Sequence, residues 1–226
     1  MSKRMKEASK VASENLYKVE DGIAVLKKFP KAKFDETVEV HVRLGIDPKQ
    51  GDQIIRGAVA MPHGLGKSRK VAVVAKGEKV KEAEAAGADT AGSDDLIEKI
   101  AKGWMDFDVL VATPDAMKDL AKVGKTLGPK GLMPNPKTGT VTFDIAKTVK
   151  ELKAGRVEYK NDAYGIIHAA VGKLSFDEAK LADNIKALMD AIVRAKPSTA
   201  KGVYLKSVTI ASTMSPGVKL DPAQKF

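Results

Sequence analysis

The feature that constrains this chain most is a change in the spacing of its apolar residues. Residues 37–44 alternate strictly, with apolar residues at the even positions and polar residues at the odd ones. Such alternation is typical of a strand with one buried and one solvated face. Residues 71–75 and 109–112 are instead short, continuous apolar runs, which are typical of parallel strands buried on both faces. The chain is therefore expected to contain two different kinds of sheet.

The middle of the chain repeats a strand-then-helix order. Each buried run is followed by a helical pattern, and a short strand at residues 89–91 with a helix at 94–101 lies between the two runs. Three β-α units in succession predict a parallel sheet whose faces are covered by helices. We expect residues 66–155 to form an inserted, Rossmann-like, three-layer α/β domain.

The two ends of the chain share the alternating style and are expected to pack together. Residues 3–29 have helical spacing, as two helices or as one kinked helix. A last strand at 203–213 changes its apolar parity near Lys206, which predicts a bulge. We expect residues 1–65 and 156–226 to form one discontinuous α+β domain with a split β-α-β-like order.

Two connecting segments carry their own signals. Ser175, followed three residues later by Glu178, predicts the capped start of a helix that Pro197 ends. Residues 124–139 are too rich in glycine and proline for regular structure. We therefore expect a long loop there, and loops of this length are commonly functional or disordered.

Charge narrows the class of partner. The 39 lysines and arginines exceed the 29 acidic residues and give a net charge of +10, which favours an anionic partner and nucleic acid first. Residues 66–155 carry +3 of this excess and the chain ends carry +7. Aromatic residues make up only 5% of the chain, which argues against binding single strands mainly by base stacking. The discontinuous domain is the better candidate for RNA contact.

Composition also favours a reducing compartment. The chain has no cysteine, which excludes disulfides and thiolate metal sites. Its N-terminus is basic and polar, without the apolar stretch of a secretion signal, and no apolar run reaches the roughly 18 residues that suggest a membrane span. We expect a cytoplasmic protein with no membrane association.

No motif for catalysis or for a bound cofactor meets its spacing requirement. Residues 64–68 (Gly-Leu-Gly-Lys-Ser) suggest a phosphate-binding loop, but Met61 occupies the place of its first glycine. His41, His63 and His168 lie far apart without ligand spacing, and His41 is expected simply on a solvated strand face. We expect no enzyme activity, no cofactor and no metal. A nucleotide-dependent enzyme built on the α/β domain is the alternative, which a test of ATP and GTP binding would decide.

Two segments are candidates for contact with RNA. Residues 124–139 carry Lys125 and Lys130 among glycines, where the backbone can approach phosphates closely. Lys33 and Phe34 precede the polar face of the alternating strand and combine a cation, a ring and hydrogen-bonding groups. From the residues alone, a solvated loop and a solvated strand face are the competing interpretations.

Several segments, in their order along the chain, resemble the ribosomal L-one family. They are residues 33–41, 45–48, 61–67, 125–137, 160–162, 180–184, 196–197 and 213–214. The most specific is Gly-Pro-Lys-Gly-Leu-Met-Pro-Asn-Pro-Lys at 128–137, a run too long to match by chance. The resemblance covers essentially the whole chain.

The resemblance implies a two-domain protein of the large ribosomal subunit whose inserted domain swings on a hinge. Members bind a structured region of 23S rRNA and form the mobile stalk near the E site, where they help to release deacylated tRNA. They also repress translation of their own operon by binding an mRNA site that mimics the rRNA. The free protein is expected to be a monomer. A stand-alone RNA-binding regulator is the second alternative, which co-sedimentation with large subunits would distinguish.

Carried over motif by motif, the family's RNA contacts fall on two strand ends. The principal contacts would be Lys33, Phe34, Thr37, Glu39, Ser212, Thr213 and Met214. Secondary contacts would be Gly165, His168, Lys125 and Lys130. The apolar side chains would pack against unstacked bases or riboses, and the hydroxyls and the carboxylate would bond to ribose hydroxyls or base edges. Ser215 departs from the family, which usually has glycine there, so the local geometry is left open.

Overall fold

The computed structural model describes residues 3–11 and 15–224 of a mixed α/β protein. The described chain divides into two compact units. The outer unit takes the residues up to Gly66 and those from Val157 onward, and the inner unit is Lys67–Arg156. Residues 1–2, 12–14 and 225–226 of the expected discontinuous domain lie outside the described residues.

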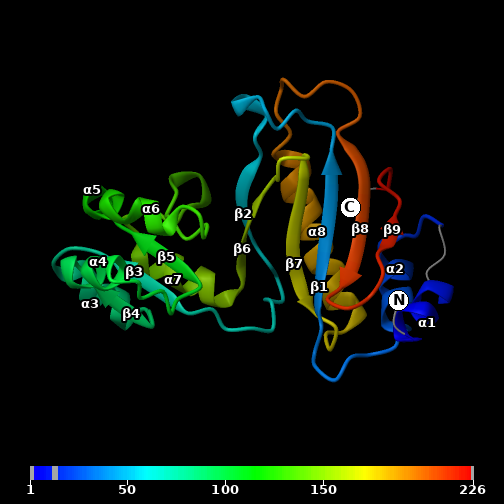
Figure 1. Ribbon diagram of the computed structural model, residues 1–226, viewed down its shortest axis with the longest axis horizontal. Coiled ribbons are helices and arrows are strands. Elements are labelled where there is room, and N and C mark those ends of the chain that lie inside the picture. Colours follow the sequence, from blue (N-terminus) through cyan, green and yellow to red (C-terminus); the bar gives the residue numbers. More distant parts are fainter. Residues whose placement is uncertain (1–2, 12–14, 225–226) are drawn as a thin grey trace. The chain divides into compact units, whose positions relative to one another are not determined.

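The outer unit is built on a four-stranded antiparallel sheet. Its strands have the order β7-β1-β8-β9, with β1 at Thr37–Leu44, β7 at Ile166–Lys173, β8 at Leu205–Ser212 and β9 at Val218–Leu220. Helices α2 (Val19–Lys27) and α8 (Glu178–Arg194) pack on one face of this sheet (Figure 1). The even residues of β1 are buried under these helices, as the alternation predicted. The odd residues of β1 point to the other face.

The register of β1 places particular side chains side by side. His41 pairs with His168 on β7 and with Thr209 on β8. The register between β1 and β8 shifts between Arg43 and Leu44, opposite Lys206, so the predicted bulge is confirmed. At the N-terminal end of the unit, α1 (Lys3–Val11) and α2 are separate helices, because residues 15–18 are not helical.

Two expectations about the outer unit were wrong or incomplete. Ser175 does not cap α8, because its hydroxyl donates to Asp35 Oδ2 at 2.8 Å and Asp177 takes the N-cap position without a side-chain cap. A two-stranded sheet of β2 (Arg56–Ala60) and β6 (Arg156–Lys160) was not predicted. Both strands are only five residues long, and β2 has no clear alternation of buried and exposed residues. They therefore leave little signal in the sequence.

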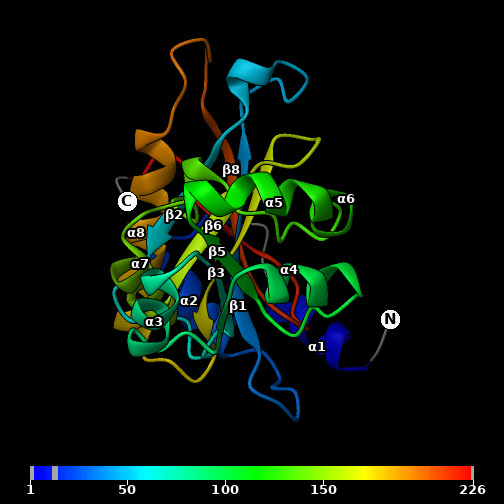
Figure 2. The ribbon, with the colours of Figure 1, turned by 90° about the vertical axis from the view of Figure 1, so that its left-hand side faces the viewer.

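The inner unit has the predicted parallel sheet, with β3 (Val71–Val74) between β4 (Thr90–Gly92) and β5 (Val109–Ala112). Alternate residues of β3 and β5 enter two separate apolar cores. One core contains α4 (Asp94–Ala101) and α5 (Met117–Leu120), and the other contains α3 (Glu78–Ala85) and α7 (Ile145–Ala154). The sheet therefore lies between two layers of helices, which Figure 2 shows from the side.

The segment after β5 is more ordered than predicted. The expected helix at 114–123 is a series of short turns, η2 (Pro114–Ala116), α5 and η3 (Ala121–Val123). The expected loop at 124–139 contains α6 (Gly124–Leu127) and η4 (Pro136–Thr138). Asn135 orders the second of these turns. Its side-chain Oδ1 accepts from the Lys137 backbone amide at 2.8 Å, and its backbone amide donates to Thr140 Oγ1 at 2.8 Å. A side-chain amide can replace missing helical hydrogen bonds in this way, so the glycine and proline content was misleading.

Candidate nucleic-acid interface

The start of β1 and the end of β8 bring two distant segments of the chain together. The Thr37 amide donates to Thr213 Oγ1 at 3.0 Å, and the Thr213 amide donates to the Thr37 carbonyl at 3.1 Å. Phe34 and Met214 flank this junction and are 54% and 51% exposed. We call Lys33, Phe34, Thr37, Glu39, Thr213 and Met214 the sheet-end site; Thr37 and Glu39 are partly buried, and the other four are exposed. Five of them are Thr37, Thr213 or residues within three positions of these two in the sequence, and Lys33 lies four positions before Thr37.

A buried carboxylate lies beneath the sheet-end site. Glu36 is only 2% exposed. Its Oε1 accepts from the Ala32 amide at 2.9 Å, and its Oε2 accepts from Ser212 Oγ at 2.5 Å and from the Met214 amide at 3.0 Å. One side chain therefore ties the segment that carries Phe34 to the turn that carries Met214. Such charge-assisted bonds are roughly twice as strong as neutral ones.

Glu36 was not among the predicted site residues, although the sequence carried a signal for it. The even positions of this strand are buried, and Glu36 continues that parity one step before the strand begins. A carboxylate at a buried position must be paired or hydrogen-bonded. The pattern therefore indicated a structural carboxylate at the strand start.

Ser212 has a different place from the one expected. It is 6% exposed, and its hydroxyl donates inward to Glu36. In this structure Ser212 therefore supports the sheet-end site from beneath. Its contact with RNA stays a prediction.

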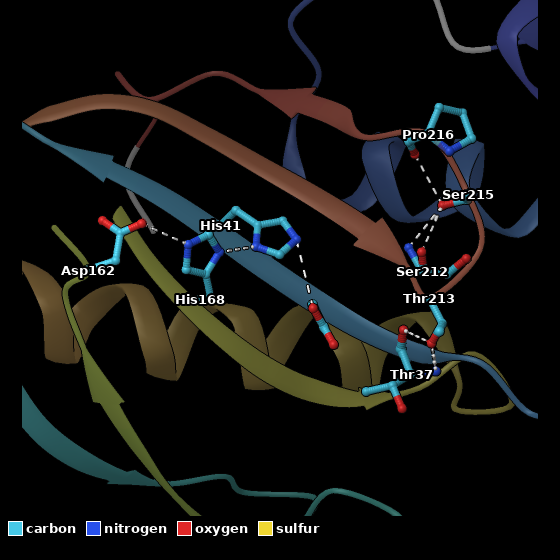
Figure 3. A network of polar contacts seen from close by, with 9 residues as sticks. Thr37, His41, Asp162, His168, Ser212, Thr213, Ser215 and Pro216 are labelled. Carbon is cyan, nitrogen blue, oxygen red and sulfur yellow. Dashed lines mark hydrogen bonds and ion pairs between the residues drawn. The ribbon is translucent and has the colours of Figure 1, made fainter. Parts of the chain in front are cut away.

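The turn after β8 explains how serine replaces the family's usual glycine. No described residue other than glycine has a positive φ, so Ser215 adopts an ordinary backbone conformation. Its Oγ accepts from the Ser212 amide at 2.9 Å, and its amide donates to the Ser212 carbonyl at 3.1 Å (Figure 3). The serine hydroxyl thus closes the turn that presents Met214.

A lysine at the end of β7 also reaches the site. Lys173 Nζ donates to Thr37 Oγ1 at 2.9 Å and lies 3.4 Å from the Asp35 carbonyl oxygen. A cavity of about 300 Å³ opens beside Phe34 and is lined by Lys31, Ala32, Phe34, Asp35, Glu36, Leu174 and Ser175. Lys173 was missed because it is 136 residues from Thr37 and only the β1–β7 register brings it near.

A chain of polar contacts crosses the open face of the sheet beside this site (Figure 3). His41 Nδ1 and His168 Nδ1 are 2.8 Å apart. His168 Nε2 lies 3.4 Å from Asp162 Oδ2, and His41 Nε2 lies 3.9 Å from Glu39 Oε2. Partial burial, with a smaller effect of His168, lowers the pKa of His41 below the ordinary histidine value. His168, a predicted secondary contact, is exposed on the same face as Glu39.

Asp162 organises the tight turn that precedes β7. Its Oδ1 accepts from the Tyr164 and Ile166 amides at 2.8 Å each. The Ile166 amide is the largest cause that lowers the pKa of Asp162. Gly165, also predicted as a secondary contact, has φ +74°, and a Cβ there would lie 3.2 Å from Ile46. Gly165 is buried and its positive φ allows the turn, while its contact with RNA stays a prediction.

The two predicted lysines of the inner unit are both exposed. Lys125 lies on α6, and Lys130 lies in the turn that follows. They belong to a different unit from the sheet-end site. Among the described residues, no group of three or more His, Cys, Asp or Glu side chains is placed to hold a metal ion. Within the same residues, no helix is both long and apolar enough to span a membrane.

Comparison with known families gives one match. Residues 26–216 match the family model described as the Ribosomal protein L1p/L10e family. The match includes every residue of the sheet-end site, the whole inner unit and most of the outer unit. Members of this family are structural RNA-binding proteins of the ribosome and not enzymes. The chain therefore belongs to the L1p/L10e family of ribosomal proteins and is an RNA-binding protein of the large ribosomal subunit.

Proposed function

We propose that this protein binds the stalk region of 23S rRNA through the sheet-end site. The observation that carries the proposal is the exposure of Phe34 and Met214 on two segments that Glu36 joins. Both are apolar and about half exposed, and both segments are held by the single carboxylate of Glu36. Exposed apolar side chains on a rigid support are suited to pack against unstacked bases and riboses.

The polar groups of the site favour recognition over general charge attraction. Thr37 and Thr213 offer hydroxyls, and Lys33 and Lys173 offer cations for phosphates. Glu39 is a carboxylate on the same face of β1 as Thr37, and it repels phosphates. Its place in an RNA surface therefore indicates contact with a hydrogen-bond donor, either a ribose hydroxyl or a base edge.

The remaining parts of the proposal concern partners and movement. We propose that the outer and inner units are two domains, 1–65 with 156–226 and 66–155, joined by a hinge. Lys125 and Lys130 of the inner domain would contact rRNA or the E-site tRNA and assist release of deacylated tRNA. The sheet-end site would also bind the protein's own operon mRNA and repress its translation. The division of the chain into two compact units supports the hinge.

Reconstitution tests the ribosomal role directly. Large subunits lacking this protein are incubated with wild type, with the double variant Lys125→Gln/Lys130→Gln, or with Phe34→Ala, and then sedimented. We expect wild type and the lysine variant to co-sediment and Phe34→Ala to be largely lost. Release of labelled deacylated tRNA should be slower with the lysine variant than with wild type. A wild-type protein that binds RNA but never co-sediments with subunits would favour the stand-alone regulator.

A further inference from the structure

The two histidines on the open face meet in an arrangement that limits where their protons can be. Their Nδ1 atoms are 2.8 Å apart, and the rings meet edge to face with centroids 5.0 Å apart. A neutral imidazole carries one N–H and one bare nitrogen. One Nδ1 must therefore carry hydrogen and donate, while the other is bare and accepts. Two protonated Nδ1 atoms would repel each other and break the contact.

The contacts of the two Nε2 atoms show which ring nitrogens carry hydrogen. His168 Nε2 faces Asp162 Oδ2 at 3.4 Å, and because a carboxylate only accepts, this Nε2 is the protonated one. His41 then donates through Nδ1, which leaves its Nε2 bare and facing Glu39 Oε2 at 3.9 Å. A lone pair directed at a carboxylate is unfavourable. One further proton on His41 Nε2 would turn this contact into an ion pair without disturbing the other two.

We propose that His41 and His168 are positioning residues of the RNA interface, and that RNA binding adds one proton from solvent to His41 Nε2 and so fixes the Glu39 carboxylate. This inference rests on the proposed RNA-binding function of the sheet-end site. His41 acts through Glu39, which is two residues away on the same face of β1. RNA phosphates add negative potential beside Glu39 and Asp162, and that potential favours the protonated pair.

The surroundings of the pair leave few other groups to take up the proton. The charged residues on its face are Glu39 and Arg43 on β1, Asp162 in the turn before β7, Lys173 at the end of β7, and Lys219 of β9, which pairs with Thr209. The β8 residues opposite Glu39, His41 and Arg43 are Ala211, Thr209 and Ser207, none of which titrates near neutral pH. Small side chains there, with Ala170 on β7, also allow RNA to approach the pair closely.

The sign of the effect follows from which state holds more protons. In the free protein, burial and the neighbouring ring keep the pKa of His41 below its ordinary value, which favours the neutral form of His41 near pH 7. RNA raises this pKa in the complex. Affinity is therefore strongest at low pH and falls as pH rises through the pKa of the complex, by up to about tenfold for each unit of difference between the two states.

The test measures proton uptake and affinity together. Binding to a stalk-rRNA fragment is followed by calorimetry near pH 7 in buffers of different ionisation enthalpy at constant salt. The variants are His41→Gln, His168→Gln and the matched control His63→Gln, whose imidazole pairs with Asp183 at 3.0 Å elsewhere in the outer unit. Wild type and His63→Gln should take up a measurable fraction of one proton per complex. His41→Gln and His168→Gln should take up almost none, and their affinity should change little between about pH 5.5 and 8.

Failure of the inference and failure of the proposed function give different results. Equal affinity of wild type for the stalk fragment and for an unrelated duplex at every pH would overturn the proposed function. Preferential binding of the stalk fragment without proton uptake would overturn only the role of the histidines. Undiminished uptake in both His41→Gln and His168→Gln would overturn it as well, because the proton would then be bound elsewhere. Thermal melts of both variants are the control that checks whether each is folded.

Discussion

Replacing Glu36 by glutamine should loosen both halves of the sheet-end site at once. The glutamine oxygen can accept from Ser212 and Met214, as the carboxylate oxygen now does, but its amide group then faces the Ala32 amide, which loses its acceptor. An unsatisfied, partly buried donor costs about 1–3 kcal/mol, and the two remaining bonds lose the assistance of the charge. We expect the free energy of unfolding to fall by about 2–4 kcal/mol in total.

Urea unfolding at pH 7 measures this loss, with Glu158→Gln as the control. Glu158 forms a partly exposed ion pair with Arg56 at 3.5 Å, so its replacement should cost no more than about 1 kcal/mol. At a temperature where both variants are folded, Glu36→Gln should also bind the stalk fragment at least about tenfold more weakly, because Phe34 and Met214 are no longer held in place. A Glu36→Gln protein that is destabilised as expected but binds the fragment like wild type would refute the positioning role.

Three further changes test other parts of the structure. Ser215→Gly should lower the free energy of unfolding by about 1 kcal/mol in urea melts, because the Ser212 amide loses the Oγ acceptor; greater stability would show that the family's glycine is preferred here. Asn184→Ala should cost about 2–4 kcal/mol by the same assay, since this fully buried amide bonds the Gly64 and Val171 carbonyls, and a loss below about 1 kcal/mol would contradict that. The Asp89 carboxylate accepts from the Val71 amide, which lowers its pKa, so its contribution is present above the ordinary aspartate pKa of about 3.9 and is lost as pH falls through the folded value. The stability difference between wild type and Asp89→Asn should therefore shrink between pH 7 and pH 3, and a constant difference would rule this out.

Local patterns predicted the strands whose burial is either regularly alternating or continuous along their length. The alternation of β1 gave its two faces correctly, and the continuous apolar runs gave the parallel sheet of the inner unit. Both signals are periodic and need no knowledge of the partner strand. The bulge at Lys206 was predictable for the same reason, because a bulge leaves its change of parity in the strand itself.

Features that depend on distant partners could not be read from local pattern. Ser175 has the spacing of a helix cap, but Asp35 competes for its hydroxyl from 140 residues away. His41 was assigned to solvent, and its contact with His168 follows from the register of β1 against β7, which a further irregularity between Val38 and Glu39 sets. Ser212 looked like a surface hydroxyl until Glu36 was found beneath it. In each case the deciding partner is a polar side chain whose sequence position carries no information about the pairing.

Specific recognition of RNA by the sheet-end site is tested by measuring how tightly the protein binds a stalk-rRNA fragment and an unrelated RNA duplex across a salt series. Wild type is compared with Phe34→Ala, Met214→Ala and Phe143→Ala, the last removing an exposed ring of the inner unit. We expect wild type to prefer the stalk fragment, and we expect Phe34→Ala and Met214→Ala each to cost about 1–3 kcal/mol of its binding free energy without affecting the duplex. Phe143→Ala should bind both RNAs like wild type. Equal binding of both RNAs, with one steep salt dependence and no effect of Phe34→Ala or Met214→Ala, would mean that the net charge of +10 accounts for the binding.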